Sequence, residues 1–224
     1  LGRQTDLIDA YRPLAAGADS KAVAVFSSRS AELLLAKQRD DEALQVLERW
    51  SVRFPNDPEP WLHLLQAYQT AERKQDVVRC QERLIALASG AERRDRMLAL
   101  ADFLHSDFAD NEGALRTLVE CHRAYPNDSI VMDRLESLLT TMNRKADLAE
   151  ILESRSRLEL DDDTRASLDF RRGFLLLQER NSVVQAIAAL VEATLAAAAK
   201  RGLLAEPAGI DAALAIDHIA RSLA

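Results

Sequence analysis

The sequence predicts an all-α protein made of tandem helix pairs, and three observations support this fold class. Only 7 Gly and 6 Pro occur among the 224 residues, so turns are few and long helices are favoured. Apolar residues recur at the spacing of one face of an α-helix. Two blocks of the chain also match each other at a fixed offset, which is typical of repeat architectures.

The two matching blocks are EALQVLERWSVRFPND at 42–57 and GALRTLVECHRAYPND at 113–128. Pro55 corresponds to Pro126, and 126 − 55 = 71, which is two periods of 34 residues plus an insertion of three. Pro ends a helix, and the Asn-Asp that follows it predicts a turn and an N-cap for the next helix. In the first block one apolar helical stripe comprises Ala43, Leu47, Trp50 and Phe54.

Between the blocks, Trp61, Leu64 and Tyr68 reproduce the pattern W-x2-L-G-x2-Y, and here the chain resembles the tetratricopeptide repeat (TPR) family. Leu65 stands where the family has Gly, and Val77 stands where it has Ala, so we expect looser or shifted helix packing in this repeat. The resemblance implies an all-α, right-handed α-α superhelix, or solenoid, of about four to five TPR-like helix pairs with a C-terminal capping helix.

On this register we expect four helix pairs over about residues 25–160. They are 25–37 with 41–53, 59–71 with 75–88, 92–106 with 112–124, and 130–142 with 147–158. The insertion is expected around 107–111. Arg155 occupies the position that Trp50 and Cys121 hold in the earlier copies.

The sequence predicts four parts along the chain. Residues 1–23 are expected to be a partial or degenerate repeat, 24–160 four TPR-like repeats, 161–200 a divergent fifth helix pair, and 201–224 a loop and a capping helix. The first residue is Leu, so we expect the chain to be a segment of a larger protein with a truncated N-terminus. The compartment stays open, with the cytoplasm favoured over the periplasm.

Composition argues against several classes of function. A net charge of −7 and a pI near 5.2 argue against a nucleic-acid binder that relies on a general positive field. No run of 18 apolar residues predicts a membrane span. Cys80 and Cys121 are too far apart for a cysteine zinc motif and are expected to be buried thiols.

No catalytic, cofactor or metal motif is present in the sequence, and we expect a protein that is not an enzyme and carries no cofactor. The glycines form no phosphate-binding loop. The histidines show no ligand spacing; they are His63, His105, His122 and His218. Trp50 and Trp61 are expected in the core between helices.

The resemblance implies that the first helix of each pair lines a concave face where a peptide or a partner protein binds. The positions that match the family's groove are polar and mixed in charge. They are Glu59, Leu62, Gln66, Gln69 and Thr70 in the second pair, Arg94, Met97 and Ala101 in the third, and Ile130, Asp133, Ser137, Thr140 and Thr141 in the fourth.

The expected function is therefore a non-catalytic protein-protein interaction scaffold. Two alternatives stay open: a repeat segment of a cell-envelope secretion or polysaccharide-export component, and a regulatory repeat segment fused to an enzyme. Self-association through the Ala-rich stretch 186–199 is a further hypothesis, because small residues permit close helix approach.

Overall fold

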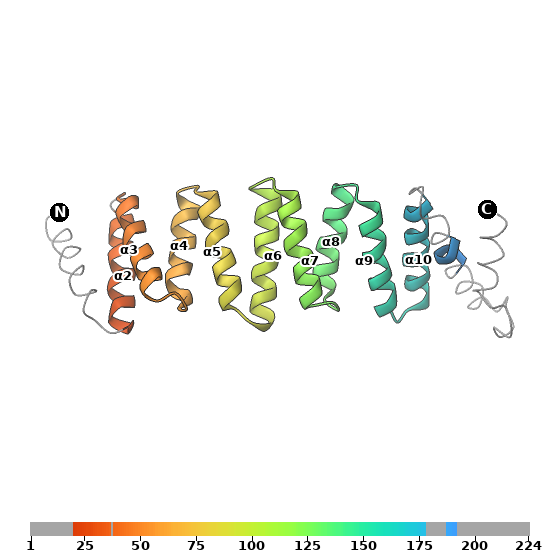
Figure 1. Cartoon of the computed structure of the whole chain (residues 1–224), viewed down its shortest axis with the longest axis horizontal. Helices are drawn as coiled ribbons and strands as arrows, with labels where there is room; N and C mark the ends of the chain where they lie inside the picture. The colour runs from red at the N-terminus through yellow and green to blue at the C-terminus, as the bar shows by residue number, and fades with distance from the viewer. Residues whose placement is uncertain (1–19, 37, 178–186, 192–224) are drawn as a thin grey trace. The chain divides into compact units, whose positions relative to one another are not determined.

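The computed structural model describes residues 20–36, 38–177 and 187–191 (Figure 1). Within these ranges the chain is helical, and none of the described residues forms a strand. This confirms the all-α helical repeat fold class. The predicted capping helix, nearly all of the segment 1–23 and most of the Ala-rich stretch 186–199 lie outside the described residues.

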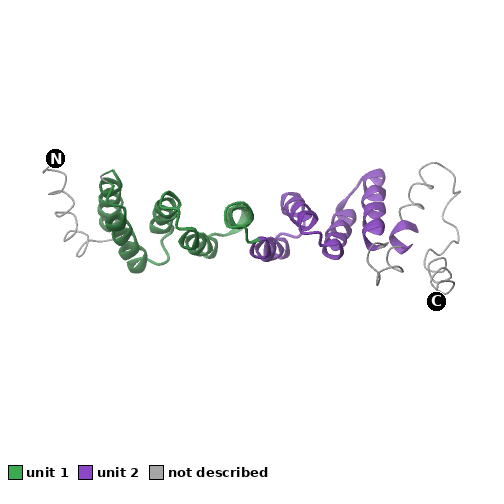
Figure 2. Cartoon of the chain, turned by 90° about the horizontal axis from the view of Figure 1, so that it is seen from above, with its two compact units in different colours: residues 1–110 green, residues 111–224 purple. Residues whose placement is uncertain are grey.

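The described helices fall into two compact units, residues 1–110 and 111–224 (Figure 2). In unit 1 the helices are α2 (Ser20–Leu35), α3 (Asp40–Arg53), α4 (Pro58–Thr70), α5 (Lys74–Leu87) and α6 (Gly90–Ser106). In unit 2 they are α7 (Asn111–Ala124), α8 (Ser129–Thr141), α9 (Lys145–Leu158) and α10 (Asp162–Leu177).

The helices begin and end close to the predicted positions. The largest difference is at α2, which begins at Ser20 rather than at residue 25. The division of the chain into four parts by repeat stays a prediction.

The connections inside the helix pairs carry the repeat in their backbone. Among the described residues, four other than glycine adopt positive φ, between 54° and 58°: Gln38, Glu72, Ala109 and Asn143. Their spacings are 72 − 38 = 34, 109 − 72 = 37 and 143 − 109 = 34 residues. A left-handed residue after a helix directs the following backbone N–H groups to the last carbonyls of that helix. The turns therefore show the 34-residue period and place the three-residue insertion between Glu72 and Ala109.

The insertion lengthens α6 more than the loop that follows it. Helix α6 has 17 residues, whereas α4 and α8 each have 13. The connection at 107–110 is only one residue longer than the one at 71–73. The expected position at 107–111 is therefore only partly right, because an added helical turn keeps its backbone hydrogen bonds satisfied.

The repeated Pro-Asn-Asp sequence ends one helix and begins the next, as predicted. The Asp57 carboxylate accepts a hydrogen bond from the Glu59 backbone N–H at 3.1 Å, at the start of α4. The Asp128 carboxylate accepts hydrogen bonds from the backbone N–H groups of Ile130 and Val131 at the start of α8. Each Asp satisfies donors that have no partner within the helix.

Unit 1 has a continuous apolar core between α2, α3, α4 and α5. Leu34, Leu47, Leu64 and Leu84 are fully or almost fully buried. Trp50 is buried and Trp61 packs against the core at its edge, as expected. The structure also confirms that Cys80 and Cys121 are buried free thiols.

Candidate partner-binding surfaces

The predicted contact residues on α4 lie together on one exposed face of that helix. They are Glu59, Leu62, Gln66, Gln69 and Thr70. The Thr70 hydroxyl donates to the Gln66 backbone carbonyl at 3.0 Å and is thus already occupied. Among the described contacts, the side chains of Glu59, Gln66 and Gln69 make no hydrogen bond, so these three groups face solvent unpaired.

The prediction for α6 was wrong for Met97 and Ala101. Both are 2% exposed and belong to the buried stripe of that helix, together with Leu100 and Leu104. Apolar residues at this helical spacing turn toward the core because burial of their surface is favourable. Arg94 is partly buried, and its guanidinium contacts the Asp95 carboxylate at 2.7 Å. Only Arg94 of the three could meet a partner.

The predicted contact residues on α8 also lie on an exposed face: Ile130, Asp133, Ser137, Thr140 and Thr141. The hydroxyls of Thr140 and Thr141 donate to backbone carbonyls one helical turn earlier, at 2.7 and 3.0 Å. Ile130 is half exposed and supplies an apolar surface at the start of the helix.

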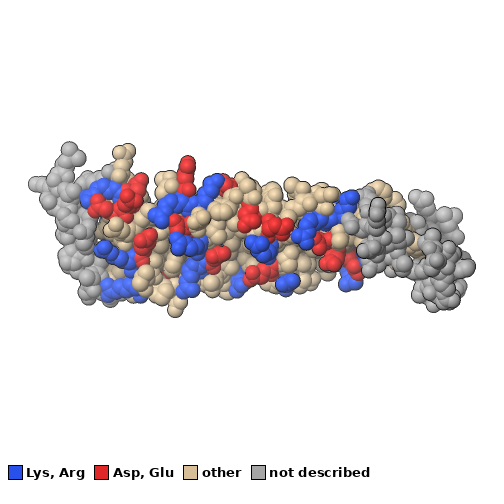
Figure 3. Space-filling view, turned by 45° about the horizontal axis from the view of Figure 1, so that its top comes forward, with Lys and Arg blue, Asp and Glu red and all other residues tan. Residues whose placement is uncertain are grey.

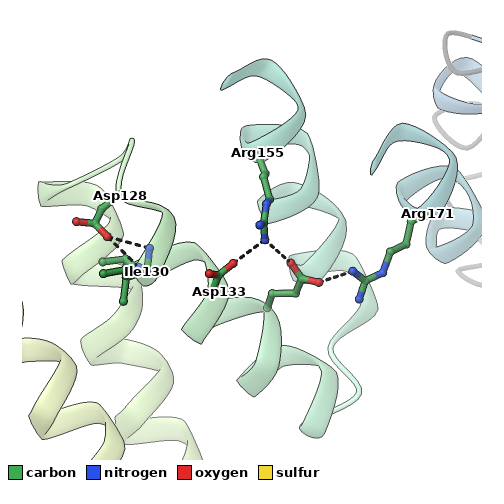
Figure 4. A network of polar contacts seen from close by, with 7 residues as sticks. Asp128, Ile130, Asp133, Arg155 and Arg171 are labelled. Atoms are coloured by element: carbon green, nitrogen blue, oxygen red, sulfur yellow. Dashed lines mark hydrogen bonds and ion pairs between the residues drawn. The ribbon is translucent and has the colours of Figure 1, made fainter. Parts of the chain in front are cut away.

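An ion-pair network that the sequence did not predict joins α8, α9 and α10 (Figure 4). The Arg155 guanidinium donates to the Asp133 carboxylate at 2.7 Å and to the Glu136 carboxylate at 3.2 Å. Arg171 of α10 donates to the other oxygen of Glu136. Asp133 is therefore not free for a partner. Arg155 occupies the repeat position that Trp50 holds in the first copy. A charged residue at an apolar repeat position was the sequence signal that could have indicated this network.

A second feature missed from the sequence is a groove of about 630 Å³ in unit 1, which we call the α3–α5 groove. It is bounded by α3 on one side and α5 on the other, and α4 forms its floor. Its lining comprises Glu48, Ser51 and Val52 of α3, Trp61, Leu64 and Tyr68 of α4, and Asp76, Arg79, Cys80, Glu82, Arg83 and Ala86 of α5.

Hydrogen bonds define one end of the α3–α5 groove. The Arg83 guanidinium donates to the Pro55 backbone carbonyl at 2.8 Å and to the Asn56 side chain at 3.2 Å. The Trp61 indole N–H donates to the same Pro55 carbonyl at 3.3 Å. The Arg83 guanidinium also lies 5.9 Å from the centre of the Trp61 ring. The turn between α3 and α4 is thus tied to α5.

Two titratable groups line the same groove, Tyr68 on α4 and Cys80 on α5. The Tyr68 hydroxyl donates to the Glu48 carboxylate at 2.7 Å. Burial, together with that carboxylate, raises the pKa of Tyr68 above its ordinary value. Burial also raises the pKa of the Cys80 thiol to about 11, so this thiol is protonated at neutral pH and is not an activated nucleophile.

A smaller pocket of about 390 Å³ is lined by residues of α3, and Glu48 and Val52 line both this pocket and the α3–α5 groove. We call it the α3 recess. Its other lining residues are Gln45, Arg49 and Arg53.

One further pocket, of about 490 Å³, lies where α4, α5 and α6 meet at the loop end of unit 1. Gln69 from the α4 face lines it, together with Phe103 and Asp107 of the α6 end. The Lys74 ammonium donates to the Asp107 backbone carbonyl and occupies part of the polar surface.

No group of three or more His, Cys, Asp or Glu side chains in the described ranges could hold a metal ion. Burial lowers the pKa of His122, and its Nδ1 is buried without a hydrogen-bond partner.

No helix of the described part has the length and apolar character needed to cross a membrane. Acidic and basic side chains are interspersed on the face shown in Figure 3.

The comparisons with known proteins give one family match. A tetratricopeptide repeat model matches residues 28–67, which run from within α2 to within α4. No curated protein matches the chain.

Several solved structures are similar to the chain at low identity. MamA (41-end) from Desulfovibrio magneticus RS-1 is 17% identical, with 81% of this chain and 97% of that chain covered and a TM-score of 0.41. YrrB, described as a TPR protein with an unusual peptide-binding site, is 14% identical, with coverages of 80% and 92% and a TM-score of 0.40. The pilF protein of Pseudomonas aeruginosa is 19% identical, with coverages of 85% and 78% and a TM-score of 0.36.

Proposed function

Because this chain consists of TPR-like helical repeats, an architecture of protein-interaction scaffolds, we propose that it is a non-catalytic scaffold that binds an extended segment of a partner protein. The contact surface is the exposed face of α4 in unit 1, with the exposed face of α8 in unit 2 as a second site. The observation that carries this proposal is the set of unpaired side chains on α4.

The α4 face suits an extended peptide for chemical reasons. The amides of Gln66 and Gln69 each offer both donors and an acceptor, which are the groups that pair with a peptide backbone. Leu62 is exposed between them and Glu59, and it provides an apolar contact. Since these polar groups make no intramolecular hydrogen bond among the described contacts, a partner does not have to displace one.

On α8 the available groups are fewer. Ser137 is exposed and its side chain makes no hydrogen bond in the part of the chain that the structure describes. Asp133 is paired with Arg155, and Thr140 bonds to its own helix. We therefore expect α8 to contribute through Ile130 and Ser137.

The test is selection of unstructured peptides from a displayed random library, followed by affinity measurement with fluorescence anisotropy. Selected peptides should bind the Gln66→Ala/Gln69→Ala variant about tenfold more weakly, because two hydrogen-bonding groups are lost. The matched control is Gln45→Ala, at an exposed position of α3. Equal affinity of all three proteins would show that the α4 face is not the contact surface.

A further inference from the structure

We propose that α10 extends the contact surface of unit 2 with an aromatic anchor site, formed by Phe170 and Phe174, which holds an aliphatic or aromatic side chain of an extended partner segment. This inference rests on the proposed scaffold function and adds to it the chemistry of the partner. Neither phenylalanine was among the contact residues predicted from the sequence.

The two rings are exposed side by side on one helix. Phe170 is 57% exposed and Phe174 is 56% exposed. They are four residues apart in α10, so they are neighbours on one face, with their Cβ atoms about 6 Å apart. Single exposed apolar residues are ordinary on protein surfaces, whereas grouped ones mark interaction sites. Because aromatic side chains are enriched at protein interfaces, this pair is suited to contact a partner.

The repeat register places both rings on the face that α4 and α8 use for the proposed contacts. Each of the three helices begins after an aspartate whose carboxylate accepts a backbone N–H: Asp57, Asp128 and Asp161. The residue nine positions after the aspartate is exposed in each helix: Gln66, Ser137 and Phe170. The residue thirteen positions after it is also exposed: Thr70, Thr141 and Phe174. The face that is polar on α4 and α8 is therefore aromatic on α10.

An ion pair connects the two contact faces within unit 2. Arg171 of α10 donates to the Glu136 carboxylate of α8 (Figure 4). Arg171 directly follows Phe170, and Glu136 directly precedes Ser137, so the two exposed faces flank this ion pair. An extended segment that binds at Ser137 can continue to the rings of α10.

The charges near the rings are compensated within unit 2, which favours an uncharged partner side chain. Arg155 and Arg171 pair with Asp133 and Glu136, two positive groups with two negative ones. The other α10 residues that neighbour the rings up to residue 174 are small and uncharged: Ala166, Ser167 and Gly173. An apolar side chain can thus pack on the rings without burying an unpaired charge, whereas a charged one would lose its hydration and gain no opposite charge.

The probe is a displayed library of unstructured random peptides selected on the whole chain. The affinities of enriched peptides are measured by fluorescence anisotropy for the parent and for each variant. Peptides that contact unit 2 should share one position that is always Leu, Ile, Met, Phe, Tyr or Trp, because only an apolar side chain gains from contact with the rings.

Two double variants separate the apolar contact from a change in fold. Phe170→Gln/Phe174→Gln removes the apolar surface, whereas Phe170→Leu/Phe174→Leu keeps most of it. Peptides of this group should bind the double Gln variant about tenfold more weakly and the double Leu variant within about threefold of the parent. The matched control is Leu160→Gln, which removes a 91% exposed apolar side chain outside α10 and should leave affinity unchanged.

A change in the peptide tests the same contact from the other side. Replacement of its shared apolar residue by Ala should weaken binding to the parent about tenfold and binding to the double Gln variant far less, because both changes remove one contact. Additive losses would show that the peptide residue does not bind the rings.

Three further results would overturn the inference. The first is a set of enriched peptides that all bind the double Gln variant as they bind the parent. The second is a double Gln variant that, without peptide, is as unstable in urea as Leu152→Ala, a change at a fully buried position; another segment of this chain would then cover the rings. The third is a chain that dimerises in light scattering and is monomeric as the double Gln variant, so that a second copy covers them.

The same measurements separate this inference from the proposed function. If no peptide is enriched, both fail. If peptides are weakened by Gln66→Ala/Gln69→Ala and none by the double Gln variant, the scaffold function stands and the anchor site falls. The reverse pattern supports the anchor site and moves the contact surface from α4 to unit 2.

Discussion

At the scale of single residues, two titratable groups that line the α3–α5 groove make the protein sensitive to alkaline pH. Burial raises the pKa of Cys80 to about 11, whereas a thiol in an unfolded chain ionises near pH 8.5. The unfolded state therefore loses its proton first. The contribution of this thiol to the free energy of unfolding is fully present below about pH 8.5 and is lost as pH rises toward 11. Tyr68, whose pKa is also raised, adds to the loss in the same direction at higher pH. Urea unfolding from pH 8 to 11 measures this.

The control for the alkaline effect is Cys80→Ala. This variant has no thiol at the site, so its stability should fall less steeply between pH 8.5 and 11 than that of the parent. Identical slopes for the two proteins would mean that Cys80 does not contribute to the pH dependence.

At the scale of the elements, the left-handed turn residues identify a position where the chain is less stable than it could be. Ala109 has φ of 55°, a conformation that costs a residue with a side chain roughly 1–2 kcal/mol. Ala109→Gly should therefore raise the free energy of unfolding by roughly 0.5–1 kcal/mol, after the entropy cost of Gly is subtracted. Urea denaturation measures the difference.

The matched control for Ala109→Gly is Ala71→Gly. Ala71 follows α4 and has φ of −83°, where a side chain is not strained. This substitution should lower stability by roughly 0.5–1 kcal/mol, because Gly only adds disorder to the unfolded chain. If the free energy of unfolding changes in the same direction in both variants, the turn at Ala109 does not store strain.

The ion-pair network gives a second prediction for the elements. The Glu136 side chain is 18% exposed and receives Arg155 and Arg171 from two other helices. Glu136→Gln should lower the free energy of unfolding by about 1 kcal/mol, a modest value because both arginines are partly exposed. The difference should shrink in high salt, which screens ion pairs. The control is Glu150→Gln at an exposed position of α9, which should show neither the loss of stability nor its dependence on salt. Equal free energies of unfolding for Glu136→Gln and Glu150→Gln would exclude a stabilising role for the network.

The elements also show how far sequence could predict this protein. Helix positions followed from Pro55 and from the Asp57 and Asp128 caps, which act over a few residues. The 34-residue period then repeats these signals along the chain. Met97 was misplaced because the insertion broke the register on which the α6 face was assigned, so family positions no longer matched burial. The Arg155 network and the α3–α5 groove depend on helices that meet in space, and no spacing along one helix encodes that meeting.

At the scale of the whole molecule, stability should be distributed helix by helix. In repeat proteins each element contacts only its neighbours, so damage in one helix spreads mainly to the helices that pack on it. Leu84 of α5 and Leu152 of α9 are almost fully buried. Changing either to Ala should cost roughly 2–5 kcal/mol of local stability. In unit 1, α4 and α6 pack on α5, and in unit 2, α8 and α10 pack on α9.

Hydrogen exchange measured by mass spectrometry tests this distribution. Leu84→Ala should speed exchange in α4, α5 and α6 more than in α2, and Leu152→Ala should speed it in α8, α9 and α10 more than in α7, because opening of a helix exposes the amides of its packing neighbours first. A uniform increase across all described helices of a unit would mean that the unit opens as one cooperative block.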